Sequence, residues 1–97
     1  MTASTLIKNA NIVNENKTFT GDVLIENERI KKIAPSISIT DPTKVTVIDA
    51  KGKYLIPGFI DDQVHFREPG LTHKANIATE SKAAIAGGIT TFIEMPN

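Results

Sequence analysis

The sequence contains no cysteine, and this absence excludes disulfide bonds and metal sites built from thiolates. It also has no excess of either charge, because 11 basic and 11 acidic residues give a formal net charge of zero. Lysine and arginine are scattered rather than clustered, so we predict no nucleic-acid partner and no anionic membrane surface as partner. No apolar run is long enough to cross a bilayer.

The N-terminus lacks a recognisable targeting signal. Residues 1–5 do not have the basic-then-apolar layout of a signal peptide. With 97 residues and no internal repeat, the chain can form one small domain with a modest core. We therefore expect a soluble, cytoplasmic protein.

Residues 1–56 have the pattern of short β-strands separated by turns. Asp22 to Glu26 is β-rich, Asn27-Glu28-Arg29 forms a tight turn, and residues 30–33 return as a hairpin. A looser polar connection over 35–44 leads to a further strand over 45–49 and then to 54–56. We predict an all-β layer, the N-terminal part of a small β-sandwich, with a structural role. The lysines of this half are expected on solvated strand faces.

After the first Pro-Gly the pattern changes to strand, loop, helix and strand. We expect a strand over 59–66, a loop over 67–72, a helix over about 74–86 and a second strand over 89–95. Gly87-Gly88 is a strong helix stop, because glycine adopts the left-handed conformation at little cost. A βαβ unit has parallel strands and a right-handed crossover, so the fold class is α/β.

Four polar side chains recur at every second position near the end of the first of these strands. Alternation along a strand would put Asp61, Gln63, His65 and Arg67 on one face. The carboxyl end of a strand is where α/β folds place their active sites. A ligand site is one interpretation. The other is structural: a hydrogen-bonded histidine, with Arg67 paired to Glu68 or Asp62. Spacing alone leaves both open.

Two parallel strands and one helix cannot close a core by themselves. A (β/α)₈ barrel needs about 250 residues. We therefore predict that residues 57–97 are the first βαβ unit of an incomplete TIM barrel, whose remaining segments would be the chain's main protein partner.

Residues Pro57 to Gly70 resemble the first barrel strand of the dihydroorotases, in the amidohydrolase superfamily. The family pattern there is P-G-hydrophobic-I-D-x-H-V-H-x-R-x-P-G. The segments 83–91 and 95–97 are similar to the next helix and strand of that family. The β-rich segments 22–25 and 47–52 are similar to the small β-sandwich before the barrel, so the resemblance covers nearly the whole chain.

The resemblance implies zinc-dependent, reversible cyclisation of N-carbamoyl-L-aspartate to L-dihydroorotate in pyrimidine biosynthesis. His65 matches the second histidine of the family's metal-binding pair, while Arg67 and Asn97 match residues that hold the substrate carboxylate; Asp61 would support them. Zinc lowers the pKa of a bound water, and an arginine fork suits a carboxylate. The resemblance implies one or two zinc ions and allows a homo-oligomer.

Gln63 departs from the family pattern, which has a histidine there. An amide oxygen is a weaker zinc ligand than imidazole. Three outcomes stay open: Gln63 ligates weakly, the site keeps fewer metal ions, or catalysis is lost. His73 matches no ligand position and is expected on the surface.

The remaining catalytic groups of the family have no counterpart in this chain. A bridging carboxylated lysine, two further histidines and a general-base aspartate would come from later strands, so we expect the isolated 97-residue chain to be inactive. An allantoinase-like cyclic amidohydrolase and a catalytically inactive homologue with a structural or regulatory role are the alternatives.

Overall fold

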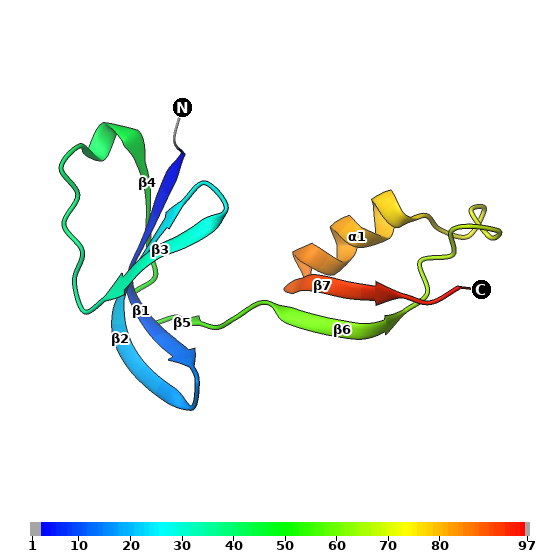
Figure 1. Ribbon diagram of the computed structural model, residues 1–97, viewed down its shortest axis with the longest axis horizontal. Coiled ribbons are helices and arrows are strands. Elements are labelled where there is room, and N and C mark those ends of the chain that lie inside the picture. The colour runs from blue at the N-terminus through cyan, green and yellow to red at the C-terminus, as the bar shows by residue number, and fades with distance from the viewer. Residues whose placement is uncertain (1–2, 97) are drawn as a thin grey trace. The chain divides into compact units, whose positions relative to one another are not determined.

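The computed structural model describes residues 3–96, and the chain divides into two compact units, Met1–Pro57 and Gly58–Asn97. The first unit is a β-sheet with one 3₁₀ turn, Pro42–Lys44. In the second, a strand is followed along the chain by a helix and then by another strand (Figure 1). The predicted mixture of α and β structure is confirmed.

The first unit forms one five-stranded sheet. Its strand order is β3-β2-β1-β4, with β5 also paired to β1. The β1–β2 and β2–β3 pairs are antiparallel hairpins, whereas β4 and β5 run parallel to β1. The strands are β1 Ser4–Asn14, β2 Lys17–Glu26, β3 Arg29–Ala34, β4 Val45–Asp49 and β5 Tyr54–Leu55.

Left-handed backbone conformations shape the β1–β2 pair at two places. Glu15 and Asn16, with φ of 50° and 62°, form a two-residue hairpin turn whose twist matches that of the strands. Asn9, with φ of 61°, lies in a β-bulge between Ile7 and Ala10. This bulge lies inside one continuous strand, because β2 pairs with β1 on both sides of it.

The core of the first unit is small and includes one charged side chain, Asp22. Asp22 is only 2% exposed, and its two carboxylate oxygens accept the N–H of Asn9 and of Ile37, both at 2.9 Å. These hydrogen bonds, that from Asn9 foremost, hold the pKa of Asp22 below its usual value, with Lys8 adding attraction and burial opposing the shift. Asp22 thus fastens the β1 bulge and the 35–44 connection to β2. The buried apolar residues of this unit are Leu6, Ala10, Ile12, Val23, Ile37 and Ala50.

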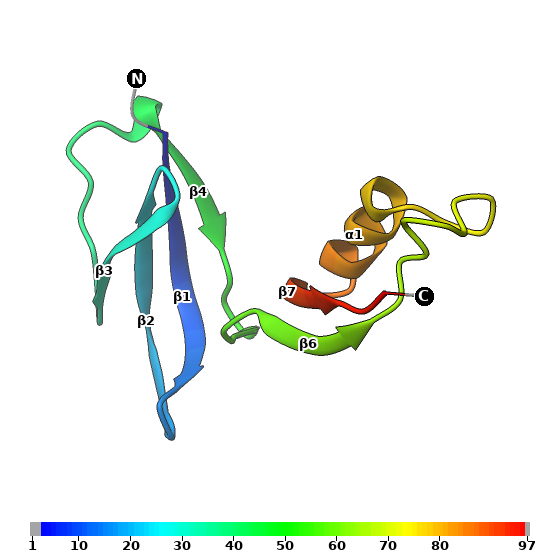
Figure 2. The same cartoon turned by 45° about the vertical axis from the view of Figure 1, so that its right-hand side comes forward.

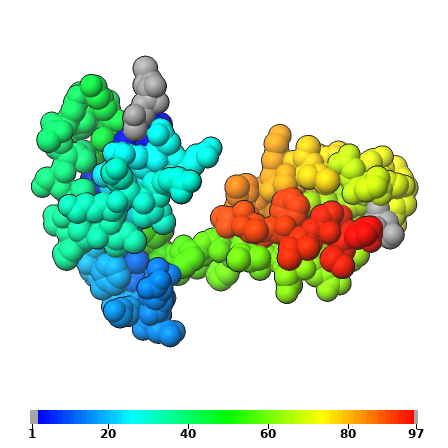
Figure 3. All heavy atoms as spheres, in the orientation of Figure 1, coloured from blue at the N-terminus to red at the C-terminus, as the bar shows by residue number. Residues whose placement is uncertain are grey.

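The second unit consists of β6 Phe59–Val64, α1 Ile77–Ala86 and β7 Ile89–Glu94. β6 and β7 are parallel neighbours, as the strand–helix–strand pattern predicted. α1 lies on one side of this strand pair in both ribbon views (Figures 1 and 2), and its atoms lie against those of β7 in Figure 3.

Local signals set the ends of α1. The helix begins three residues later than predicted because Asn76 is its N-cap, with its side-chain oxygen accepting the N–H of Thr79 at 2.9 Å. Gly88, with φ of 99°, takes the left-handed conformation just after the helix. Ile85, in the last turn of the helix, is 64% exposed.

Among residues 3–96, no helix has the length and apolar character needed to span a membrane.

Candidate functional site

The predicted polar segment lies at the carboxyl end of β6, and it is not a regular strand. β6 ends at Val64, two residues earlier than predicted. Asp61 pairs with Phe92 and Val64 pairs with Glu94, so three steps along β6 match two steps along β7. Asp62 and Gln63 therefore lie together opposite the single residue Ile93, as in a β-bulge.

This bulge changes which side chains share a face. Phe92 and Glu94 are two residues apart in β7, so their partners Asp61 and Val64 lie on one face of the pair. All four are half-buried, while Gln63 and His65 are exposed. The prediction that Asp61 shares a face with Gln63 and His65 is wrong, because the extra residue reverses the alternation.

Asp61 contributes to the bulge itself. Its Oδ1 accepts the N–H of Gln63 at 3.1 Å, a local bond between residues two apart. This bond fixes the backbone from which the Gln63 side chain projects.

Gln63 and His65 have no side-chain hydrogen bond or ion pair to any residue within 3–96, so their donor atoms are available for a ligand. The same residues contain no group of three or more His, Cys, Asp or Glu side chains that could hold a metal ion. His73 is exposed, as predicted. Asn97 lies outside the described residues.

Arg67 follows β6 in the left-handed region, with φ of 72°. This backbone conformation is uncommon for a residue other than glycine and must be held by its surroundings. The Arg67 carbonyl accepts the N–H of Leu71 at 2.9 Å, which closes the turn after the strand. Within residues 3–96, the half-buried Arg67 forms an ion pair with neither Asp62 nor Glu68, so the structural interpretation of this arginine is not supported.

Two glutamates hold this segment in place: Glu94, for which the sequence predicted no role, and Glu68, which it offered only as a partner of Arg67. Both carboxylate oxygens of Glu94 accept the N–H of Phe66, at 3.0 and 3.2 Å. Glu68 Oε1 accepts the N–H of Ile77, in the first turn of α1, at 3.1 Å. An acidic residue at the end of an apolar strand, as Glu94 is, was the signal available in the sequence.

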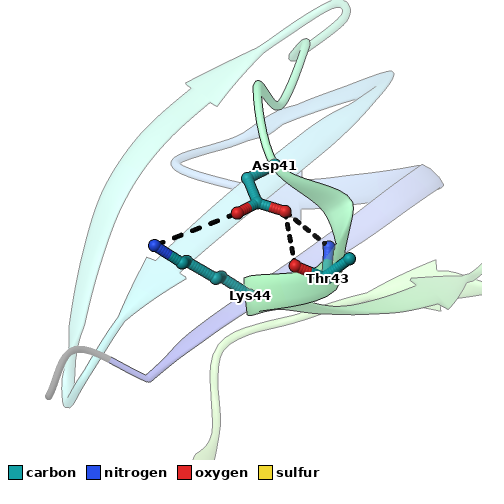
Figure 4. A network of polar contacts seen from close by, with 3 residues as sticks. All are labelled: Asp41, Thr43 and Lys44. Atoms are coloured by element: carbon teal, nitrogen blue, oxygen red, sulfur yellow. Dashed lines mark hydrogen bonds and ion pairs between the residues drawn. The ribbon is translucent and has the colours of Figure 1, made fainter.

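A concavity with a volume of about 460 Å³ lies in the first unit. Its lining includes β1, β2 and the 38–45 segment. Its cation Lys44 pairs with Asp41 at 3.9 Å, and Asp41 also accepts the N–H of Thr43 at 3.0 Å (Figure 4). The carboxylate of Glu26, which also lines the concavity, pairs with Lys31 at 3.9 Å. The charged side chains of this lining therefore have partners within the described residues.

The family-model match and the curated relatives both carry the name dihydroorotase. The model of the family described as dihydro-orotase-like matches residues 52–97. The dihydroorotase of Carboxydothermus hydrogenoformans is 51% identical over 94 residues, and that of Caldicellulosiruptor saccharolyticus is 47% identical over 94. This chain is similar to the dihydroorotases.

The matches span 95% of this chain, but only 21% and 22% of these two relatives. Two solved structures of hydantoinases also match almost all of this chain and about a fifth of their own length. An L-hydantoinase (dihydropyrimidinase) from Arthrobacter aurescens superimposes with a TM-score of 0.84 at 30% identity, covering 98% of this chain and 21% of that one. A D-hydantoinase (dihydropyrimidinase) from Thermus sp. gives a TM-score of 0.74 at 40% identity, covering 94% and 20%.

Proposed function

We propose that this chain forms the first part of a dihydroorotase, a metal-dependent cyclic amidohydrolase that interconverts N-carbamoyl-L-aspartate and L-dihydroorotate in pyrimidine biosynthesis. The observation that carries the proposal is the 51% identity to a dihydroorotase across almost the entire chain. The alternatives, an allantoinase-like enzyme and an inactive homologue, are not favoured, because three curated relatives that are 42–51% identical to this chain are dihydroorotases.

The proposal includes the fold of the complete enzyme. The parallel β6–α1–β7 unit would be the start of a (β/α)₈ barrel over residues 57–97, and the sheet of residues 1–56 would be part of a small β-sandwich. The apolar side chains exposed on the second unit support the proposal that further barrel segments would cover it. Ile60 is 68% exposed and Phe59 is 57% exposed. Packing against the rest of a complete barrel would lower both exposed fractions. The predicted cytoplasmic location and homo-oligomer belong to the same proposal.

Arg67 and Asn97 would bind the free carboxylate of the substrate. A guanidinium offers a planar pair of N–H donors to a carboxylate, and Arg67 has no ion pair within residues 3–96 that would compete. An amide such as that of Asn97 would add a neutral donor. Dihydropyrimidinases act on rings without this carboxylate, so Arg67 favours the dihydroorotase substrate over theirs.

His65 and Gln63 would hold one edge of the metal site. Both are exposed with free donor atoms, which fits a ligand role, but two donors do not complete a zinc site. The remaining ligands and the general base would come from later barrel strands. Zinc bound there would supply Lewis-acid polarisation of the amide carbonyl. Asp61 would support Gln63 through the backbone bond at the bulge.

A chimera of this chain with a relative, called the joined protein, tests the proposal. Residues 1–97 would replace the matching segment of the Carboxydothermus hydrogenoformans dihydroorotase, and cyclisation of N-carbamoyl-L-aspartate would be measured. We expect activity in the joined protein and none in the purified 97-residue chain. A second joined protein with the Caldicellulosiruptor saccharolyticus relative guards against a host that does not fold. Folded, metal-loaded but inactive joined proteins would refute the proposal.

A further inference from the structure

The Glu94 carboxylate forms an unusual contact at the end of β7. Both of its oxygens accept a single backbone N–H, that of Phe66, at 3.0 and 3.2 Å. A hydrogen bond to a carboxylate is stronger than one between neutral groups. Glu94 is half-buried, and within residues 3–96 it has no ion pair with a cation. Its negative charge is therefore directed at the backbone rather than at a neighbouring side chain.

This contact extends the pairing of the two strands beyond their regular ladder. The last bond of the backbone ladder is donated by the Met95 N–H to the Val64 carbonyl at 2.8 Å. The Phe66 N–H lies two residues further along, and the Glu94 side chain accepts it in place of a backbone carbonyl. The Phe66 ring also lies against that of Phe92, with 4.7 Å between the ring centroids. Phe66 is thus fixed at both its amide and its ring.

Phe66 lies between His65 and Arg67 in the chain. In the proposed function, His65 would bind the metal and Arg67 the substrate carboxylate. Fixing the backbone of Phe66 also fixes the starting points of both neighbouring side chains. Arg67 needs such support most, because its left-handed conformation is unfavourable unless its surroundings hold it.

We propose that Glu94 is a positioning residue, which orients His65 and Arg67 for metal and substrate through the Phe66 amide. This inference rests on the proposed function and adds a residue to it. Glu94 itself touches neither substrate nor metal in this account. It also joins the segment before Arg67 to β7 through the Phe66 amide.

The contact can be tested in the joined protein without any assay of activity. Hydrogen exchange of the Phe66 amide would be measured by NMR in the wild type, Glu94→Ala and Glu94→Gln, with Glu80→Gln as a control in the same unit. We expect Glu94→Ala to speed exchange by about tenfold or more, since it removes a charge-assisted bond. Glu94→Gln keeps one acceptor oxygen and should retain part of the protection, and Glu80→Gln should leave it unchanged.

The positioning role requires kinetics in the joined protein. Glu94→Ala should raise KM for N-carbamoyl-L-aspartate by about tenfold or more, with a smaller change in kcat, because the main loss is of carboxylate binding. Glu94→Gln should restore most of the affinity, and Glu80→Gln should behave as the wild type. A residue that only stabilised the fold would lower the amount of folded enzyme without this selective change in KM.

Each outcome decides a separate statement. Unchanged Phe66 exchange in Glu94→Ala would overturn the contact and with it the positioning role. Faster exchange with an unchanged KM in an active protein would overturn the positioning role alone. An inactive wild-type joined protein would overturn the proposed function, while the exchange experiment would still decide whether Glu94 holds Phe66.

Discussion

Replacing Asp22 by asparagine tests whether a buried carboxylate holds the first unit together. Asparagine has almost the same shape but keeps only one acceptor oxygen, and its amide group would face the second N–H donor. One of the two bonds, to Asn9 or to Ile37, is therefore lost, and a buried donor is left without an acceptor. We expect a loss of about 2–4 kcal/mol in the free energy of unfolding, the combined cost of a charge-assisted bond and an unsatisfied buried group.

The effect of pH gives the same experiment a second test. The pKa of Asp22 is lowered in the folded chain, so the unfolded state binds the proton more readily. The stabilisation is then fully present above the unfolded value of about 3.9 and is lost as the pH falls through the lower folded value. Asparagine does not titrate, so the difference between wild type and Asp22→Asn should shrink below about pH 4.

Urea unfolding followed by circular dichroism, at neutral pH and through a series down to pH 3, measures both effects. Glu28→Gln is the matched control, because Glu28 is an exposed turn residue of the same unit and should change the free energy of unfolding by less than about 0.5 kcal/mol. An Asp22→Asn variant as stable as the wild type, or a difference that does not change with pH, would refute the reasoning.

Three further substitutions have clear expected outcomes. Gly58→Ala should destabilise the second unit by about 1–3 kcal/mol in urea unfolding, because the new Cβ would lie 2.7 Å from the Thr90 Cβ. Asn76→Ala should cost about 0.5–2 kcal/mol and reduce the helical circular dichroism signal, because it removes the N-cap of α1. Gln63→His should raise zinc retention in the joined protein against a chelator, because imidazole is the better zinc ligand.

Each of these substitutions has its own control. Combining Gly58→Ala with Thr90→Gly should recover stability if the clash is the cause, and no recovery would contradict it. Asn76→Asp should retain the cap, so an equal loss in both Asn76 variants would argue against capping. Unchanged zinc retention in Gln63→His would indicate that this side chain points away from the metal.

The sequence was sufficient for the βαβ unit because its signals are local. A β-rich run, an amphipathic stretch ended by two glycines and a second β-rich run required no knowledge of distant contacts. The helix start was placed too early because Asn76, the N-cap, follows residues 74 and 75, which suit a helix as well as a turn. The hairpin turn after β2 was equally readable from Asn27 and its neighbours.

The bulge in β6 could not be predicted, because it depends on pairing with β7. Alternation assumes one residue opposite one residue, and only the register reveals that Asp62 and Gln63 share a single partner position. Similarly, the role of Glu94 depends on an amide 28 residues away in sequence. The polar types at the candidate site were visible in the sequence, whereas their faces and contacts depended on the neighbouring strand.

The bulge also determines which deletions this segment can tolerate. Losing one codon at position 62 or 63 would leave Asp61 opposite Phe92 and Val64 opposite Glu94, because two steps would then match two steps. Losing a codon at position 65 would instead draw the Phe66 amide away from Glu94. A lineage could therefore convert this strand end to regular pairing by a single in-frame deletion, and would give up one of its two adjacent polar side chains in doing so.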